Sequence, residues 1–135
     1  LMARRPDSRE QAMDNAERFF AVVGSRGFDT NIDEVRERAG RAYDRCFHPR
    51  GFMRQLVAIM GSPPRAQALR HVRHPAAVIH GSDDVLIPPI GGRHTAAALP
   101  NASLRIVPGM GHDLPRGAWP IYREEIRRVA DMAKA

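Results

Sequence analysis

Hydrophobic positions in the first 60 residues recur at the period of amphipathic helices. Residues 8–23 place apolar side chains about 3.6 positions apart, which predicts a first helix. A second helix is predicted to begin after Thr30 or Asn31, both good N-cap residues, and to end before Pro49. A third, over residues 51–60, is apolar around more of its circumference, so we expect it to be the most enclosed of the three.

The pattern changes at Pro63–Pro64, after which short apolar runs alternate with helical segments. Residues 76–80 form a short continuous apolar run that ends with His80, which predicts a strand covered on both faces, as in parallel sheets flanked by helices. Residues 104–107 predict a second strand. Helices are predicted over residues 89–99 and 115–133. The order strand, helix, strand, helix indicates an α/β fold with a right-handed crossover and a parallel strand pair.

Two parallel strands are too few for a stable sheet. No internal repeat or low-complexity segment supplies further strands, so we expect the sheet to continue outside these 135 residues. The sequence also begins Leu1-Met2. Because translation starts with Met, we expect either a tag remnant before Met2 or a start inside a longer product.

Composition limits the class of protein. A chain of 135 residues with 43% hydrophobic content amounts to one domain. Its apolar runs stop after a few residues, whereas a membrane helix needs about 20, so we expect no membrane span and no signal peptide. The single cysteine, Cys46, cannot form an internal disulfide. Since that fits a reducing compartment, we expect a cytoplasmic protein.

Basic residues outnumber acidic ones by 21 to 15, for a net charge of +6, and all of them except Lys134 are arginine. They are spread along the chain and interleaved with carboxylates, as in residues 34–38 and 123–128. That spacing is typical of solvated helix faces with i,i+3 and i,i+4 ion pairs. A nucleic-acid binder would gather its basic residues in one stripe with stacking aromatics, so we expect no nucleic-acid partner.

Side chains capable of proton transfer follow each predicted strand. Asp83 and Asp84 come after the first strand, and His112 comes after the second. The carboxyl ends of parallel strands meet at one edge of the sheet, where ligands bind, so we expect Asp84 and His112 to lie close together. A carboxylate facing an imidazole orients the ring, fixes its tautomer and stabilises the imidazolium.

These two segments, Gly81–Asp84 and Gly109–His112, resemble the acid and histidine segments of the α/β-hydrolase family, whose triad runs in the order nucleophile, acid, histidine. The resemblance implies that Asp84 is the triad acid and His112 the general base, although a shift of the acid by one residue, to Asp83, stays open. It implies a serine hydrolase for small-molecule carboxylic esters that needs no cofactor and no metal.

The resemblance covers about half of a family member. It implies that residues 63–135 are the C-terminal part of an α/β-hydrolase core and that residues 1–62 are a helical cap segment. Within the family the chain is similar to cap-bearing serine esterases and to non-haem haloperoxidase-like members. Perhydrolysis by the same triad therefore stays open beside ester hydrolysis.

The family's nucleophile motif, Gly-x-Ser-x-Gly, is absent from the sequence. Gly24–Gly27 comes nearest, but it follows a predicted helix and its second glycine is one place too early; Ser62 and Ser82 lack the flanking glycines. We therefore expect the chain to lack nucleophile and oxyanion hole and to hydrolyse no ester alone. The alternative is a non-catalytic truncated fragment whose open sheet edge pairs with a second copy or with the N-terminal half of the fold.

Simpler interpretations of single residues also stay open. Asp84 could cap the next helix, and His112 could be a structural hydrogen-bonding histidine. A metal site is another interpretation, for a group of possible ligands. It is the weaker one, because Pro75 ends any helix there; the group is His71, His74, His80 and Asp83. Four apolar residues could line an acyl pocket beneath a cap or could pack in an ordinary core: Phe47, Phe52, Met53 and Met60.

Overall fold

The computed structural model describes residues 6–134, which divide into two compact units. The first unit comprises the chain up to Val22 together with Asn31–Pro63, and the second comprises Val23–Thr30 together with the chain from Pro64 onward. The short segment Val23–Thr30 thus belongs to the second unit although it connects two helices of the first. The assignment of residues 1–62 to a cap stays a prediction.

Three helices make up the first unit: α1 (Arg9–Val23), α2 (Ile32–Arg45) and α3 (Pro49–Met60). They fall where the helical periodicity predicts them. Of the two candidate N-caps for α2, the structure selects Asn31, whose side-chain oxygen accepts a hydrogen bond from the backbone N–H of Glu34 at 3.2 Å. This bond satisfies one of the free N–H groups at the start of the helix.

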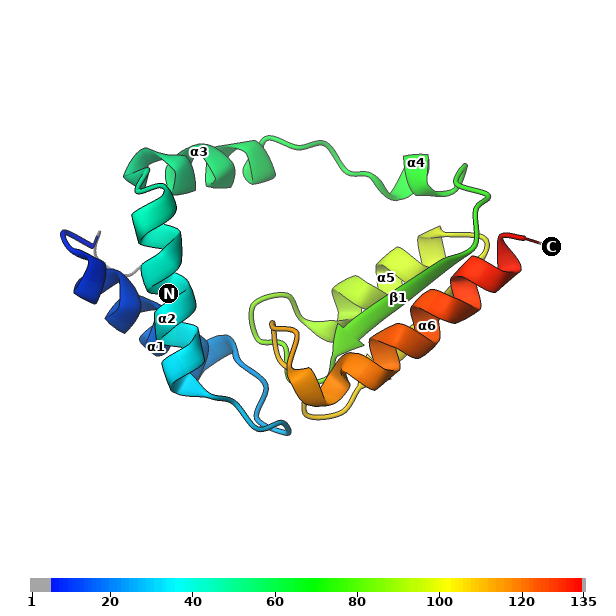
Figure 1. Ribbon diagram of the computed structural model, residues 1–135. Helices are drawn as coiled ribbons and strands as arrows, with labels where there is room; N and C mark the ends of the chain where they lie inside the picture. The colour runs from blue at the N-terminus through cyan, green and yellow to red at the C-terminus, as the bar shows by residue number, and fades with distance from the viewer. Residues whose placement is uncertain (1–5, 135) are drawn as a thin grey trace. The chain divides into compact units, whose positions relative to one another are not determined.

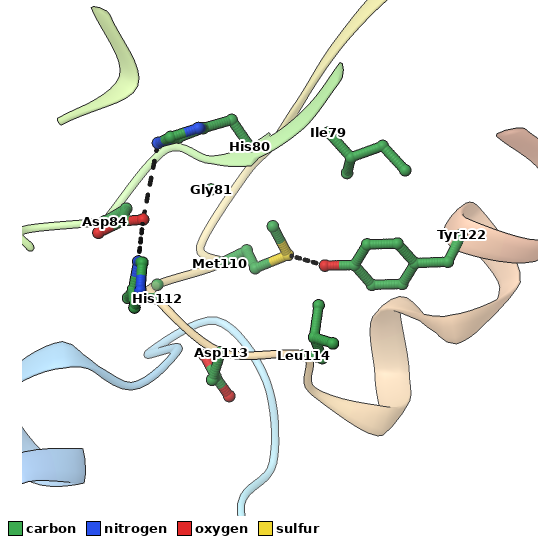
Figure 2. A pocket seen from close by; sticks show the side chains of 10 residues that line it. Ile79, His80, Gly81, Asp84, Met110, His112, Asp113, Leu114 and Tyr122 are labelled. Atoms are coloured by element: carbon green, nitrogen blue, oxygen red, sulfur yellow. Dashed lines mark hydrogen bonds and ion pairs between the residues drawn. The ribbon is translucent and has the colours of Figure 1, made fainter. Parts of the chain in front are cut away.

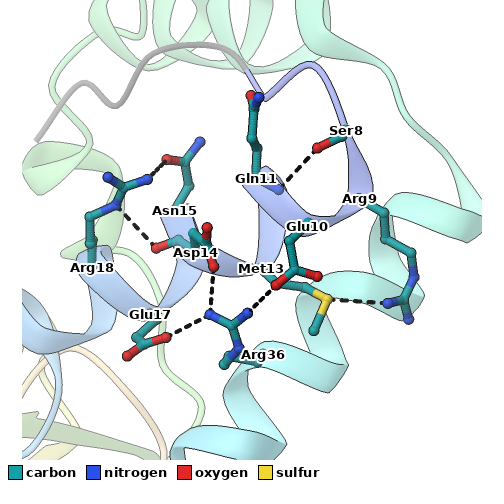
Figure 3. A network of polar contacts seen from close by, with 10 residues as sticks. All are labelled: Ser8, Arg9, Glu10, Gln11, Met13, Asp14, Asn15, Glu17, Arg18 and Arg36. Atoms are coloured by element: carbon teal, nitrogen blue, oxygen red, sulfur yellow. Dashed lines mark hydrogen bonds and ion pairs between the residues drawn. The ribbon is translucent and has the colours of Figure 1, made fainter.

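An arginine on α2 ties that helix to α1 (Figure 3). The guanidinium of Arg36 contacts the carboxylates of Glu10 at 2.6 Å and of Asp14 and Glu17 at 2.7 Å each. The hydrogen bonds to Asp14 and Glu17 raise the pKa of Arg36 above its already high ordinary value. The interleaved charges thus form ion pairs between helices as well as along them.

The third helix is not enclosed, contrary to the sequence-based expectation. None of the described side chains of α3 is buried, and Met60 at its end is 79% exposed. The apolar circumference of α3 has no covering element within the described part of its unit. Four apolar residues of this region are exposed rather than packed in a core: Phe47, Phe52, Met53 and Met60.

The second unit contains a two-stranded parallel sheet of β1 (Ala76–Gly81) and β2 (Ala102–Val107). The other elements of the unit are α4 (Ala66–Leu69), α5 (Pro89–Ala98), the short 3₁₀ helix η1 (Arg116–Ala118) and α6 (Trp119–Met132). Ala76 pairs with Ala102 and Gly81 with Val107, so both strands end at the same level. The α/β fold class and the parallel pair are therefore confirmed.

The strand β2 begins two residues earlier than its apolar run predicts. The cause is Asn101, whose side chain donates to the carbonyl of Arg73 at 2.6 Å and whose own carbonyl accepts from the N–H of Ala76 at 3.0 Å. These two bonds align the start of β2 with the start of β1, which extends the pairing beyond the apolar residues.

The core of this unit lies at the carboxyl ends of the strands. Helices α5 and α6 both pack against β1, and Figure 1 shows β1 between them. Val107, Met110 and Ala118 are buried there, and they are surrounded by partly buried Phe28, Ile79, Ile121 and Tyr122. The core thus forms directly beneath the two loops that carry Asp84 and His112.

Within the described residues, β1 pairs with β2 alone, and none of the helices is long and apolar enough to cross a membrane.

Candidate active site

The two loops predicted to carry chemistry leave the sheet at the same edge. β1 ends at Gly81 and leads to Asp84, while β2 ends at Val107 and leads to His112. The backbones come very close here, because a Cβ added at Gly81 would lie 2.6 Å from the carbonyl carbon of Met110. Gly109, at φ +72°, makes the turn that brings the second loop back over the first.

Asp84 and His112 form the hydrogen-bonded pair that their spacing predicts (Figure 2). Asp84 is 6% exposed, and its Oδ2 lies 2.8 Å from Nδ1 of the His112 ring. Its other oxygen, Oδ1, accepts hydrogen bonds from the backbone N–H groups of Leu86 at 3.0 Å and Ile87 at 2.9 Å. Asp84 therefore closes its own loop with one oxygen and faces the imidazole with the other.

These contacts show whether Asp84 caps the next helix, α5. Oδ1 of Asp84 binds N–H groups of the loop before α5, and α5 itself begins at Pro89 after Pro88, without a side-chain cap. Capping of the next helix is thus not the role of Asp84. The neighbouring Asp83 is exposed and accepts a hydrogen bond from the hydroxyl of Ser82 at 2.6 Å, so the structure brings Asp84 and not Asp83 to the histidine.

The surroundings keep Asp84 ionised. Burial by itself would raise the pKa of Asp84, but the N–H of Ile87, the ring of His112 and the N–H of Leu86 stabilise the carboxylate, and the pKa lies below its ordinary value. An ionised carboxylate only accepts hydrogen bonds, so Nδ1 of His112 carries a proton, and in the neutral form of the ring the lone pair is on Nε2. The His112 side chain is 38% exposed, which leaves the ring accessible.

A second histidine, His80, lies on the other side of the acid. Its Nε2 is 2.9 Å from the carbonyl oxygen of Ile87 and 3.6 Å from Oδ2 of Asp84. A carbonyl oxygen can only accept, so Nε2 of His80 donates the proton and holds the loop closed around the acid. Its ring packs against Gly92 of α5, where an added Cβ would lie 2.9 Å from the Cβ of His80. Sequence reasoning considered His80 only as a metal ligand and missed this role, although its place four residues before Asp84 is a local signal.

A cavity of about 280 Å³ opens beside this pair. Figure 2 shows it bounded by apolar side chains and by the hydroxyl of Tyr122, which donates to the sulfur of Met110 at 3.0 Å. The residues that line it are Ile79, His80, Gly81, Asp84, Met110, Gly111, His112, Asp113, Leu114 and Tyr122. The pair thus faces a largely apolar space with few polar groups, as small-molecule sites do.

Among residues 6–134, no group of three or more His, Cys, Asp or Glu side chains is arranged to hold a metal ion. The structure does not bring His71, His74, His80 and Asp83 together as such a group.

The serine nearest to the family's nucleophile motif, Ser25, does lie close to the His112 loop. It follows α1 and not a strand, as the periodicity predicts. Its hydroxyl donates to Asp113 and accepts from the N–H of Gly111 at 2.9 Å. In the described part of the chain no serine hydroxyl is hydrogen-bonded to the His112 ring.

Comparison with known proteins gives the context for this site. No family model matches the chain. BpoC of Mycobacterium tuberculosis, named as a non-heme bromoperoxidase, is similar in structure with a TM-score of 0.61 and 25% sequence identity, over 87% of this chain and 46% of BpoC. Rv0554 of the same organism gives 0.61 and 25%, over 90% and 44%. CarC, a serine hydrolase involved in carbazole degradation, gives 0.63 and 17%, over 98% and 50%.

These solved structures are α/β-hydrolase proteins, and this chain spans about half the length of each. The chain therefore has the architecture of one half of the α/β-hydrolase fold, as the two sequence segments imply.

Proposed function

We propose that this chain supplies the acid, Asp84, and the general base, His112, of a serine hydrolase for carboxylic esters. The observation that carries the proposal is the 2.8 Å contact between Oδ2 of Asp84 and Nδ1 of His112, at the carboxyl ends of two parallel strands. The architecture of half an α/β-hydrolase fold supports it, and so does the resemblance of CarC, named as a serine hydrolase.

The proposed chemistry follows from the protonation states of the pair. Nε2 of His112 takes the proton of a serine hydroxyl while the serine oxygen bonds to the ester carbonyl carbon. The imidazolium formed is stabilised by the ionised Asp84 and then gives its proton to the leaving alcohol as the carbon–oxygen bond breaks. A water molecule, deprotonated by the same Nε2, then bonds to the acyl carbon; the bond from that carbon to the serine oxygen breaks, the acid leaves, and the imidazolium returns its proton to the serine oxygen.

The serine and the oxyanion hole would come from residues outside this chain. We propose that they enter through strands of the N-terminal half of the same fold, added to the unpaired edge of β1. An open strand edge favours such pairing because its N–H and C=O groups lack partners. The alternative is that the 135 residues are a non-catalytic truncated fragment, whose open edge pairs with a second copy of the chain or with the N-terminal half of the fold.

The substrate we propose is a small or lipophilic ester, since the cavity beside the pair is lined mainly by apolar side chains. Phe47, Phe52, Met53 and Met60 stay candidates for an acyl pocket. Perhydrolysis is a second candidate, in which hydrogen peroxide in place of water attacks the acyl-enzyme and releases a peracid. The similarity to BpoC, named as a non-heme bromoperoxidase, favours it. A cytosolic location remains part of the proposal, because the single cysteine, Cys46, is free and exposed.

Hydrolysis of 4-nitrophenyl butyrate tests the proposal. We expect the isolated chain to show no turnover above buffer, and the polypeptide that joins it to the rest of the fold to be active. In that polypeptide, His112→Ala should lower kcat/KM by at least about 10⁴-fold. The control is His94→Ala, which removes an exposed histidine of α5 and should leave the rate unchanged. Equal rates for both variants would refute the assignment of His112, and His112-dependent turnover by the isolated chain would refute the need for a serine from elsewhere.

A further inference from the structure

A short segment from the loop between α1 and α2 runs against the loop that carries His112. We call this segment, Val23–Gly27, the strap. The N–H of His112 donates to the carbonyl of Val23 at 2.7 Å, and the N–H of Gly27 donates to the carbonyl of Gly109 at 2.8 Å. Both ends of the strap are therefore bonded by main-chain groups to the turn that presents the general base.

Ser25 stands at the middle of the strap and is only 6% exposed. Its hydroxyl accepts from the N–H of Gly111 at 2.9 Å and donates to Oδ1 of Asp113. Its backbone N–H also donates to Oδ1 of Asp113, at 2.9 Å. Ser25 thus binds the residue before His112 and the residue after it, so the histidine is held on both sides.

The Asp113 carboxylate does not compete for the imidazole. Figure 2 shows it directed away from the Asp84–His112 pair, and Oδ1 is bound twice by Ser25. A charge that points away from the reacting groups and is bound at a buried serine is placed to hold the loop.

The fit between strap and loop leaves no room for adjustment. A Cβ added at Gly111 would lie 2.6 Å from the carbonyl carbon of Gly24, and one added at Gly27 would lie 2.7 Å from the Cα of Gly109. Close-packed backbone of this kind deforms little, so a displacement of the strap would be passed on to the position of His112.

We propose that Ser25 and Asp113 are positioning residues that fix the imidazole of His112 from the strap. This rests on the proposed function of His112 as general base, and it adds two residues to a site that sequence motifs limit to Asp84 and His112. Loss of the hydrogen bonds of Ser25 to Asp113 and Gly111, which we call the clamp, leaves the Asp84–His112 pair chemically intact but lets the His112 ring move. Since a misplacement of about 1 Å can cost a factor of about 100 in rate, we expect kcat to fall while KM stays nearly constant.

The test uses the polypeptide that carries this chain with the rest of the fold, and 4-nitrophenyl butyrate as substrate. Ser25→Ala should lower kcat about 10- to 100-fold with little change in KM. The matched control is Ser103→Ala, which removes another hydroxyl bonded in the same unit, to Arg128, but far along the strand from His112. If Ser103→Ala turns over the ester at close to the wild-type rate, loss of a hydrogen-bonded serine elsewhere in the unit does not by itself lower kcat.

Asp113 provides a second, independent pair of variants in case Ser25→Ala folds poorly. Asp113→Asn retains an Oδ1 acceptor for both groups of Ser25 and should keep kcat close to the wild-type value, whereas Asp113→Ala should reproduce the Ser25→Ala defect. The proposal is overturned if Ser25→Ala and Asp113→Ala change kcat no more than Ser103→Ala does, or if Asp113→Asn is as impaired as Asp113→Ala.

A proton NMR readout separates failure of this proposal from failure of the proposed function. The proton shared by Nδ1 of His112 and Asp84 should give a resonance downfield of the amides, and Ser25→Ala should broaden it while Ser103→Ala leaves it sharp. If the wild type hydrolyses no ester but the resonance responds in this way, the positioning role of Ser25 is supported and the proposed function is refuted. If the wild type hydrolyses the ester and the resonance is the same in both variants, only the positioning role is refuted.

Discussion

Replacing Asp84 by Asn turns one carboxylate oxygen into an NH₂ group, and the hydrogen bonds around Asp84 determine which oxygen this is. Oδ1 accepts from two backbone N–H groups, of Leu86 and Ile87, so the amide oxygen of the variant must take that place. The amide NH₂ then occupies the place of Oδ2, 2.8 Å from Nδ1 of His112. Because an NH₂ group can only donate, His112 must accept at Nδ1 and carry its proton on Nε2.

In that tautomer the ring has no lone pair toward a serine hydroxyl. The imidazolium would also lose the charge that stabilises it. We therefore expect Asp84→Asn to lower kcat about 10⁴-fold in the proposed hydrolase, as in a Ser-His-Asp triad whose acid is amidated. That factor corresponds to about 5 kcal/mol of transition-state free energy. The fold should be retained, since the hydrogen bonds that close the loop are kept.

The assay is kcat for 4-nitrophenyl butyrate, with Asp83→Asn as the matched control on the adjacent, exposed carboxylate. The control should be unaffected. A wild-type rate for Asp84→Asn, or an equal loss in both variants, would show that the tautomer argument is wrong and would reopen the assignment of the acid to Asp83.

Three further predictions concern stability. The pKa of Asp84 is lowered in the folded chain, so its carboxylate stabilises the fold above the ordinary aspartate pKa, and this contribution is lost as pH falls from that value through the lowered one. Urea unfolding over that acid range should show a drop in the free energy of unfolding, and Asp84→Asn should make this drop smaller. An identical drop in both proteins would contradict the prediction. Gly111→Ala should destabilise the second unit by about 1–3 kcal/mol, because its Cβ would meet backbone atoms of Gly24 at 2.6 Å. Gly91→Ala, whose Cβ would meet only the Ile87 side chain at 3.2 Å, should cost far less, and similar urea midpoints for the two variants would contradict the close fit. Arg36→Met should lower the melting temperature more than Arg41→Met does, since Arg36 pairs with three carboxylates and Arg41 with one, and equal melting temperatures would show that the network adds nothing.

The secondary structure and the acid–histidine pair could be predicted because their signals are local. Apolar runs mark β1 and β2, and the parallel crossover between them brings their carboxyl ends to one edge. That topology places the loops after the two strands at one edge of the sheet. The resemblance to the α/β-hydrolase family singled out Asp84 and His112, and Asp83 stayed open as the acid until the structure showed the 2.8 Å contact of Asp84 with His112.

Burial was harder to predict than secondary structure, because the apolar pattern of a helix does not show whether another element covers it. The apolar circumference of α3 indicates an enclosed helix, but none of its described side chains is buried. An apolar pattern reports what a helix would bury in the presence of a suitable surface, and the described residues of its unit provide none. The same reasoning explains the unpaired edge of β1.

The strap could not be predicted, because its contacts join residues 88 positions apart. Gly24–Gly27 reads locally as a failed nucleophile motif and as the end of a helix. Nothing in the spacing of Ser25 and Asp113 indicates that they meet. The contact of His80 with the Asp84 loop could have been predicted, because His80 lies only four residues before Asp84 in the sequence.

The most direct test of the central claim is to map the serine that reacts with a fluorophosphonate probe in the polypeptide that carries this chain together with the rest of the fold. Mass spectrometry of the labelled protein should locate the probe on a serine outside these 135 residues, and His112→Ala should abolish the labelling. A probe found on Ser25 or on any other serine of this chain, or labelling that persists in His112→Ala, would contradict the proposal that Asp84 and His112 activate a serine supplied from elsewhere.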